Sequence, residues 1–245
     1  MPFTFAHPAI ILPLKYFPKK WFSCTGLIIG SLTPDFEYFI RMKVQSNYSH
    51  TVAGIFWFDL PLAILLTFVF HNLIRNELFF NLPNYLKSRT IVFTEFNWTN
   101  YFSNNLFIVL LSTIIGIASH LFWDAFTHEH GYFVNHIPEL KNTFIVFGNK
   151  VSFWKATQHL STLVGTIVII TAFLKLPKKH SYKSQENLKY WLIIIIVSTV
   201  VLILKFSISF NLKTYGNIIV SIISSFLLSL IITPFLIKSN SNYKI

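Results

Sequence analysis

Long apolar runs separated by short polar segments make up most of the chain. An apolar run of about 20 residues can cross the hydrocarbon layer of a bilayer as an α-helix. A shorter apolar helix comes first and is stopped by a proline. The pattern predicts an all-α polytopic membrane helical bundle of about five to six transmembrane helices, formed from Phe22–Leu32, Thr51–Leu73, Leu106–Phe126, Thr157–Leu174, Tyr190–Phe206 and Tyr215–Ile237.

The segments between the apolar runs are short or irregular in pattern. We expect a short N-terminal helix at His7–Tyr16, broken near Pro18. Residues 75–105 read as a mixed loop, and 128–155 as a polar, irregular segment with Gly131 and Gly148. No internal repeat is visible, and we expect a single membrane domain over residues 1–245. Its metal-site portion would be 1–170, and its last two spans would lie in 190–237.

Composition supports a membrane protein and argues against a nucleic-acid partner. The chain is 53% hydrophobic and only 12% charged, whereas soluble domains carry about 25% charged residues. The net charge of +11 comes from residues clustered in loops rather than in a binding stripe, so the expected partner is the lipid bilayer. The single cysteine, Cys24, excludes an internal disulfide and a zinc site built mainly from cysteine. The oligomeric state stays open.

The loop charges also predict an orientation. With the spans above, 13 of the 20 Lys and Arg residues fall on one side of the membrane and seven on the other. Lys and Arg near span ends are retained in the cytoplasm. We therefore expect a bacterial inner (cytoplasmic) membrane protein whose extracytoplasmic side carries the smaller set: Arg41, Lys43, Lys141, Lys150, Lys155, Lys205 and Lys213.

The most distinctive polar residues lie at the end of the second long run. His120, Asp124 and His128 stand four residues apart, so they share one face of a helix. Imidazole nitrogen and carboxylate oxygen are ligands that suit Zn²⁺ and similar divalent ions. Three such groups beside a membrane-length segment are costly to bury unless they are compensated, and a bound metal would do so.

Four further residues map to the same membrane face under the predicted topology: His7, Asp35, His50 and His159. Each has an ordinary alternative, because a lone histidine at a helix end is often a cap or interface residue and Asp35 after Pro34 suits a turn. His130 is an alternative ligand to His128, and the role of Asp59 inside a span stays open. His71 and His180 fall on the opposite side and read as ordinary loop or interface residues.

Several short motifs together resemble a bacterial family of multi-spanning membrane proteins of unassigned function. They are Pro2-Phe3-Thr4-Phe5-Ala6-His7-Pro8, Gly30-Ser31-Leu32-Thr33-Pro34-Asp35-Phe36-Glu37-Tyr38, Ser49-His50-Thr51, the segment 119–128 and Gln158-His159-Leu160-Ser161-Thr162. The resemblance covers roughly residues 1–170.

A more distant similarity concerns the order of the histidines and aspartates. It resembles the zinc-dependent phospholipase C and single-strand nuclease superfamily and the related membrane-bound metal-dependent hydrolases, which are all-helical phosphoesterases. The resemblance implies that one metal is held by Asp35, His50, His120 and a bridging Asp124, and that His7, His128 and His159 serve a second or third. The soluble enzymes carry an acid where this chain has Leu163. One or two Zn²⁺ ions, or another divalent metal, are therefore expected.

The leading functional hypothesis is a membrane-embedded metal-dependent phosphoester hydrolase acting on a lipid-linked or membrane-near substrate. Glu37 or Glu129 would act as general base, and Arg41 with Lys43 would receive the phosphate charge. Two alternatives stay open. The same groups would hold a transported cation in a binding or transport protein, although no inverted repeat is visible. A non-catalytic scaffold with a structural metal would need only four ligands, fewer than the seven candidates.

Overall fold

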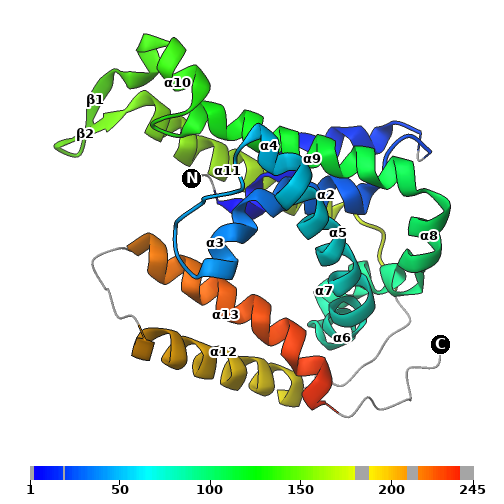
Figure 1. Ribbon diagram of the computed structural model, residues 1–245. Helices are drawn as coiled ribbons and strands as arrows, with labels where there is room; N and C mark the ends of the chain where they lie inside the picture. The colour runs from blue at the N-terminus through cyan, green and yellow to red at the C-terminus, as the bar shows by residue number, and fades with distance from the viewer. Residues whose placement is uncertain (1–2, 19, 180–187, 209–214, 238–245) are drawn as a thin grey trace. The chain divides into compact units, whose positions relative to one another are not determined.

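The computed structural model describes residues 3–18, 20–179, 188–208 and 215–237. Within them the regular secondary structure is helical apart from one small hairpin (Figure 1). The α-helices are α1 (Pro8–Ile11), α2 (Cys24–Leu32), α3 (Phe36–Arg41), α4 (Val52–Gly54), α5 (Leu60–Val69), α6 (Arg75–Asn81), α7 (Asn84–Thr90), α8 (Trp98–Asn104), α9 (Leu106–Thr127), α10 (Tyr132–His136), α11 (Phe153–Leu174), α12 (Leu188–Ile208) and α13 (Tyr215–Leu236). Shorter 3₁₀ turns are η1 (Thr4–Ala6), η2 (Leu12–Tyr16), η3 (Thr33–Asp35), η6 (Ile91–Glu95) and η7 (Pro138–Lys141); η4 (Ile55–Asp59) and η5 (Phe70–Ile74) are π-helical.

Five helical segments of the described residues are long and apolar enough to cross a membrane. They are Val52–Asn81, Leu106–His136, Phe153–Leu174, Leu188–Ile208 and Tyr215–Leu236. The predicted all-α membrane bundle is therefore confirmed. α2, with nine residues, is too short to be one of these spans, since a transmembrane helix needs about 20.

Two segments are more regular than the sequence pattern indicated. Residues 75–105 were expected as a loop, but they fold into α6, α7, η6 and α8. The prediction was wrong because these helices are short and mix polar with apolar residues, so they lack a long apolar periodicity. In the segment 128–155, expected to be irregular, strands β1 (Thr143–Val146) and β2 (Asn149–Ser152) pair antiparallel, with Thr143 opposite Ser152. Their turn residues Phe147 and Gly148 have φ of 47° and 78°, as a two-residue type I′ turn requires.

The chain divides into two compact units. The first comprises 1–35, 48–65 and 102–175, and the second comprises 36–47, 66–101 and 176–245.

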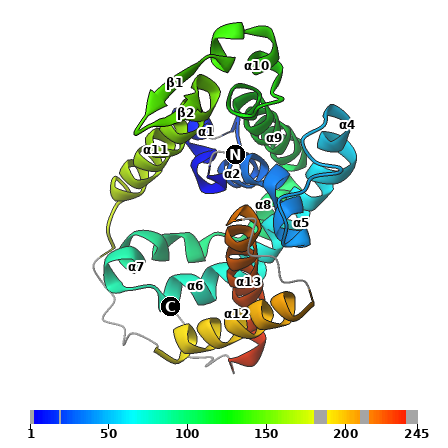
Figure 2. The ribbon, with the colours of Figure 1, turned by 90° about the vertical axis from the view of Figure 1, so that its left-hand side faces the viewer.

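In the first unit, α2 packs against α9 (Figure 2). Glycines allow this approach: a Cβ atom on Gly30 would lie 2.3 Å from the Thr113 carbonyl oxygen, and one on Gly116 would lie 2.4 Å from that of Leu27. Small residues at a helix interface let the two backbones come close. The contact fixes the end of α2, and with it η3, beside the middle of α9.

The second unit contains the last two long helices, α12 and α13, which pack against each other (Figure 1). Tyr190, Ile194 and Leu230 form the buried centre of this contact, and side chains of α6 and η5, including Leu78 and Ile74, pack around them. This unit contains none of the seven histidines and aspartates predicted as metal ligands.

Candidate metal centre

Two helices and two connecting segments of the first unit bring the candidate ligands together. His120 and Asp124 lie one turn apart on α9, and both are buried. Asp35 ends η3, directly after α2, and His50 lies just before α4. The close packing of α2 on α9 therefore carries Asp35 to the two α9 residues.

Four side chains meet at one point, as the sequence analysis predicted. One ligand atom from each of Asp35, His50, His120 and Asp124 lies within 4.8 Å of the other three. His120 Nε2 is 3.3 Å from Asp124 Oδ2 and 3.6 Å from Asp35 Oδ1. His50 Nε2 is 3.4 Å from Asp124 Oδ2 and 3.6 Å from Asp35 Oδ1. This group can hold a metal ion.

These distances match a coordination shell better than a hydrogen-bonded network. Charge-assisted hydrogen bonds between nitrogen and carboxylate oxygen are about 2.7–2.9 Å long. Two atoms bound at about 2.0–2.2 Å from a tetrahedral zinc ion lie about 3.3–3.6 Å apart. Within the described part of the chain, His120 Nε2, Asp35 Oδ1 and both carboxylate oxygens of Asp124 have no hydrogen-bond partner. Buried polar atoms normally have one, so a cation at their centre would compensate them.

The ring nitrogen of His120 and the carboxylate oxygen of Asp35 that face away from the centre are held by hydrogen bonds. His120 Nδ1 lies 2.7 Å from the Ser31 carbonyl oxygen, which can only accept, so Nδ1 carries a proton and Nε2 is the ring nitrogen that faces the centre and could bind a metal. The Thr4 hydroxyl donates to Asp35 Oδ2 over 2.5 Å, which leaves Oδ1 for the centre. Such partners orient metal ligands in proteins.

The backbone at His50 is strained. Its φ is 61°, in the left-handed region that residues other than glycine rarely adopt. The Ser49 hydroxyl lies 2.9 Å from His50 Nδ1, on the side of the ring opposite Nε2. A strained residue persists when the surrounding structure determines it, and such residues cluster at functional sites.

The second carboxylate oxygen of Asp124 faces two more histidines. Asp124 Oδ1 is 3.6 Å from His7 Nε2 and 3.5 Å from His128 Nδ1. The His7 ring stacks on that of His120, with centroids 3.7 Å apart. His128 Nδ1 also lies 3.1 Å from the backbone carbonyl oxygen of Asp124; because this oxygen can only accept, Nδ1 donates its proton to that hydrogen bond. The side of Asp124 facing His7 is thus a second position where a cation would be stabilised.

Burial and charge act in opposite directions on the ionisable groups here. Burial, aided by the neighbouring His120, lowers the pKa of His7 to about 3, so this ring is neutral. Burial alone would raise the pKa of Asp35, but the charge of His120 holds it below its ordinary value. Burial alone would lower the pKa of His50, but the carboxylates of Asp124 and Asp35 raise it to about 9. A metal at the centre would displace that proton, because imidazole binds metals in its neutral form.

His159 and Glu129 are not part of the four-residue group. His159 is exposed on α11, where the neighbouring Gln158 instead donates a hydrogen bond to the Thr127 carbonyl oxygen at the end of α9. Glu129 is exposed directly after His128. Their proposed roles, as third-ion ligand and as general base, stay predictions.

Glu37 and Arg41 lie in the second unit and pair with each other. Arg41 Nε donates to Glu37 Oε1 over 2.8 Å, and the buried carboxylate of Glu37 also accepts from the Ser46 hydroxyl and the Asn47 backbone N–H. Their roles as base and as phosphate-binding group stay predictions.

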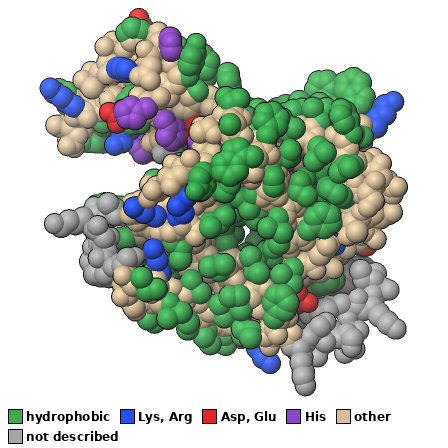
Figure 3. Space-filling model, in the orientation of Figure 1, with side chains coloured by type: hydrophobic (Ala, Val, Ile, Leu, Met, Phe, Trp, Pro, Cys, Tyr) green, Lys and Arg blue, Asp and Glu red, His purple; other side chains and the backbone are tan. Residues whose placement is uncertain are grey.

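The remaining residues discussed from sequence occupy varied places. His130 is exposed, and Asp59 is fully buried at the end of η4 in the first unit. Figure 3 shows histidine side chains gathered at the surface near the hairpin of that unit. His180 lies outside the described residues.

Sequence reasoning missed Thr4, Ser31 and Ser49, which hold Asp35, His120 and His50. All three lie inside the motifs that carried the family resemblance. Position within those motifs was the available signal, since serine and threonine are common residues and Ser31 acts through its backbone carbonyl, which any residue has.

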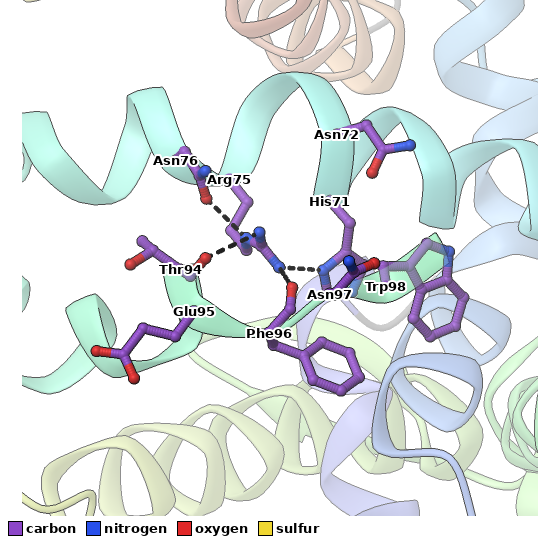
Figure 4. Close-up of a pocket in the computed structure, with 9 residues that line it drawn as sticks. All are labelled: His71, Asn72, Arg75, Asn76, Thr94, Glu95, Phe96, Asn97 and Trp98. Carbon is purple, nitrogen blue, oxygen red and sulfur yellow. Dashed lines mark hydrogen bonds between the residues drawn. The ribbon is translucent and has the colours of Figure 1, made fainter. Parts of the chain in front are cut away.

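A second buried polar cluster surrounds Arg75 in the other unit, beside a cavity of about 400 Å³ (Figure 4). Arg75 Nη1 donates to the Phe96 carbonyl oxygen over 2.6 Å, and Nη2 donates to that of Thr94 over 3.2 Å. Nε donates to Asn76 Oδ1 over 2.9 Å. His71 Nδ1 lies 2.9 Å from Nη1, and because guanidinium only donates, this nitrogen accepts and is unprotonated. None of the predicted ligands lines this cavity.

Comparison with known proteins places the chain in a family but not beside a characterised protein. Neither the curated proteins nor the solved structures contain a match. A family model described as a domain of unknown function, DUF4184, matches residues 1–235 of the 245. The protein therefore belongs to the DUF4184 family, which agrees with the expected family of unassigned function.

Proposed function

We propose that this protein is a membrane-embedded, metal-dependent hydrolase of phosphoesters, with a substrate that is lipid-linked or lies near the membrane. The observation that carries the proposal is the group of Asp35, His50, His120 and Asp124, whose facing atoms have the spacing of a coordination shell. The distant resemblance to zinc-dependent phospholipases and nucleases supports the reaction class.

The ligand set favours a catalytic over a structural metal. A structural zinc site is closed by four protein ligands. Here Asp124 presents a second oxygen to His7, a residue beyond the four of the first group, and His128 lies on the same side. One or two Zn²⁺ ions would fit these positions, with Asp124 between them. A divalent ion there would supply Lewis acidity, polarising a phosphoryl oxygen and activating water for attack.

The chain's own residues would position this chemistry. Asp35 and His120 are held by Thr4 and by the Ser31 carbonyl, so little rearrangement is needed on binding. We assign the general base to Glu129, because it is exposed directly after His128, whereas the Glu37 carboxylate already accepts three hydrogen bonds.

The test is metal analysis of the purified full-length protein, paired with hydrolysis of bis-p-nitrophenyl phosphate and p-nitrophenyl phosphate with and without chelator. We expect bound zinc and a chelator-sensitive activity that Asp124→Asn abolishes. Glu139→Gln, which changes an exposed carboxylate of η7, is the matched control and should keep both. Metal without activity toward either ester would reject the hydrolase and favour the transport or scaffold alternative.

We further propose that the centre faces the extracytoplasmic side of a bacterial inner membrane, from the 13-to-seven distribution of basic residues. After Cys24 is replaced, a cysteine at Asn142 should react with an impermeant thiol reagent in intact cells. A cysteine at Ser181, which lies outside the described residues, should not react. The reverse pattern would invert the orientation and leave the metal site unchanged.

A further inference from the structure

A second cavity, of about 330 Å³, lies in the other unit between the end of α12, the beginning of α13 and the chain after α3. Two lysines line it, Lys43 from the chain after α3 and Lys205 from α12. No carboxylate is among its lining residues, and neither lysine has an ion pair within the described residues. Two cations that line one cavity repel each other, and an anion bound between them would offset that repulsion.

Helix geometry explains only one of the two lysines. Lys205 lies in the last turn of α12, where a cation is favoured by the helix dipole. Lys43 gains nothing from that dipole, because it lies outside α12, on the chain that follows α3. Lys43 is exposed and Lys205 is half-buried, and an anion bound between them would interact with both.

Hydrogen bonds hold the chain around Lys43 on α13. The Val44 backbone N–H donates to Asn217 Oδ1 over 2.9 Å, and the buried Ser221 hydroxyl donates to the Met42 carbonyl oxygen over 3.2 Å. The residue between these two anchors, Lys43, is thus fixed at the cavity rather than carried on a loose loop. Figure 3 shows basic side chains gathered over α3 and the beginning of α13.

The other lining residues are the polar Asn217 and Ser221 and three apolar side chains. Met42, Phe206 and Ile218 line the cavity, and it opens at the ends of two membrane-length helices. A small inorganic anion would use the lysines alone, whereas a phospholipid would place its phosphate between them and its acyl chains along α12 and α13. Basic pockets between transmembrane helices bind anionic headgroups in this way.

We propose that this cavity binds a phosphate group through Lys43 and Lys205, and that the phosphate belongs to the headgroup of an anionic phospholipid. Free inorganic phosphate offers the same chemistry and is the source to be distinguished. The proposal is independent of the metal centre, because it involves neither the first unit nor any hydrolytic step.

The test is amine footprinting of the full-length protein in nanodiscs, with acetylation of individual lysines followed by mass spectrometry. The three conditions are phosphatidylcholine alone, phosphatidylcholine with phosphatidylglycerol, and phosphatidylcholine with added inorganic phosphate. Lys189 is the matched internal control, because it lies exposed at the opposite end of α12. At about nine-tenths occupancy only about one-tenth of the sites are free, so acetylation of Lys43 and Lys205 should slow about tenfold.

Slowing of both lysines by phosphatidylglycerol, with Lys189 unchanged, would support the proposal. Slowing by inorganic phosphate alone would keep the anion site and reject the lipid as its ligand. No slowing in either condition would overturn the proposal, as would equal slowing of Lys189, since that indicates only general charge at the membrane surface.

Paired variants give a second measurement. Native mass spectrometry should show fewer bound phosphatidylglycerol molecules on Lys43→Gln/Lys205→Gln than on wild type, with the Lys189→Gln count unchanged. A shared decrease in all variants, or no decrease in the double variant, would reject the cavity as the binding site. Circular dichroism checks that the variants are folded.

Discussion

The two buried polar clusters of this protein differ in the distances between their polar atoms. Around Arg75, donors and acceptors meet at 2.6–3.2 Å, and the guanidinium ties the backbone of residues 94–96 to η5 and α6. Around Asp124, nitrogen and oxygen atoms face one another at 3.3–3.6 Å. The first cluster is complete with protein atoms alone, and the second has the spacing of groups arranged around a cation.

This difference separates a structural role from a chemical one. Buried charge is common to both clusters, so charge and burial alone do not identify a functional site. The distances between partner atoms distinguish the two roles. The distinction between the two clusters fails if loss of Asp124 lowers stability rather than metal affinity, or if loss of Arg75 changes metal binding.

Asp124→Ala should have the largest effect on metal binding. Asp124 faces His50 and His120 with one oxygen and His7 and His128 with the other. Removing a residue that only supports a ligand lowers metal affinity about 10–100-fold. Removing Asp124 itself should therefore lower metal affinity by more than about 100-fold. Elemental analysis and competition with a chromophoric chelator measure this. His159→Ala is the comparison variant and should lose less metal; wild-type metal content in Asp124→Ala would refute the site.

Arg75→Met should change stability and leave metal content unchanged. The substitution leaves the carbonyl oxygens of Phe96 and Thr94 without the guanidinium donor. Unsatisfied buried polar groups cost about 1–3 kcal/mol each, so with two carbonyl oxygens the free energy of unfolding should fall by about 2–6 kcal/mol. Denaturation of the purified protein measures the change in stability, and metal analysis of the folded fraction measures the metal content. Loss of metal from folded Arg75→Met would show that the two clusters are coupled.

Thr4→Val should have the smallest effect. It removes the hydroxyl that donates to Asp35 Oδ2 and keeps the side-chain volume. Metal affinity should fall about tenfold, the lower end for loss of a residue that orients a ligand. Thr4→Ser should restore the affinity, because it keeps the hydroxyl. A Thr4→Val variant that binds metal as wild type does would indicate that packing alone orients Asp35.

Much of the architecture was predictable because apolar length is a strong signal. The five long helices follow from runs that only a bilayer or a large core accommodates. The short helices of residues 75–105 were missed, because their mixed sequences depend on tertiary contacts such as those of Arg75. The hairpin was missed because its four-residue strands are flanked by other turn-forming residues.

The candidate centre was partly predictable for a different reason. His120 and Asp124 share a helix face, so spacing relates them directly. Asp35 and His50 were linked to them only through topology and family resemblance. No periodicity could show that His50 adopts φ of 61°, or that Thr4 and Ser31 orient the ligands, since these contacts join residues far apart in sequence.

The glycine contact between α2 and α9 sets the distance between the two helices that position the candidate metal ligands. Metal bonds tolerate about 0.2 Å of error, and a Cβ atom on Gly116 would come within 2.4 Å of the Leu27 carbonyl oxygen. A single methyl group there would separate the helices by more than the coordination shell allows. The fit of the centre to a metal ion would then depend on a contact between two helix backbones that contains none of the four ligands.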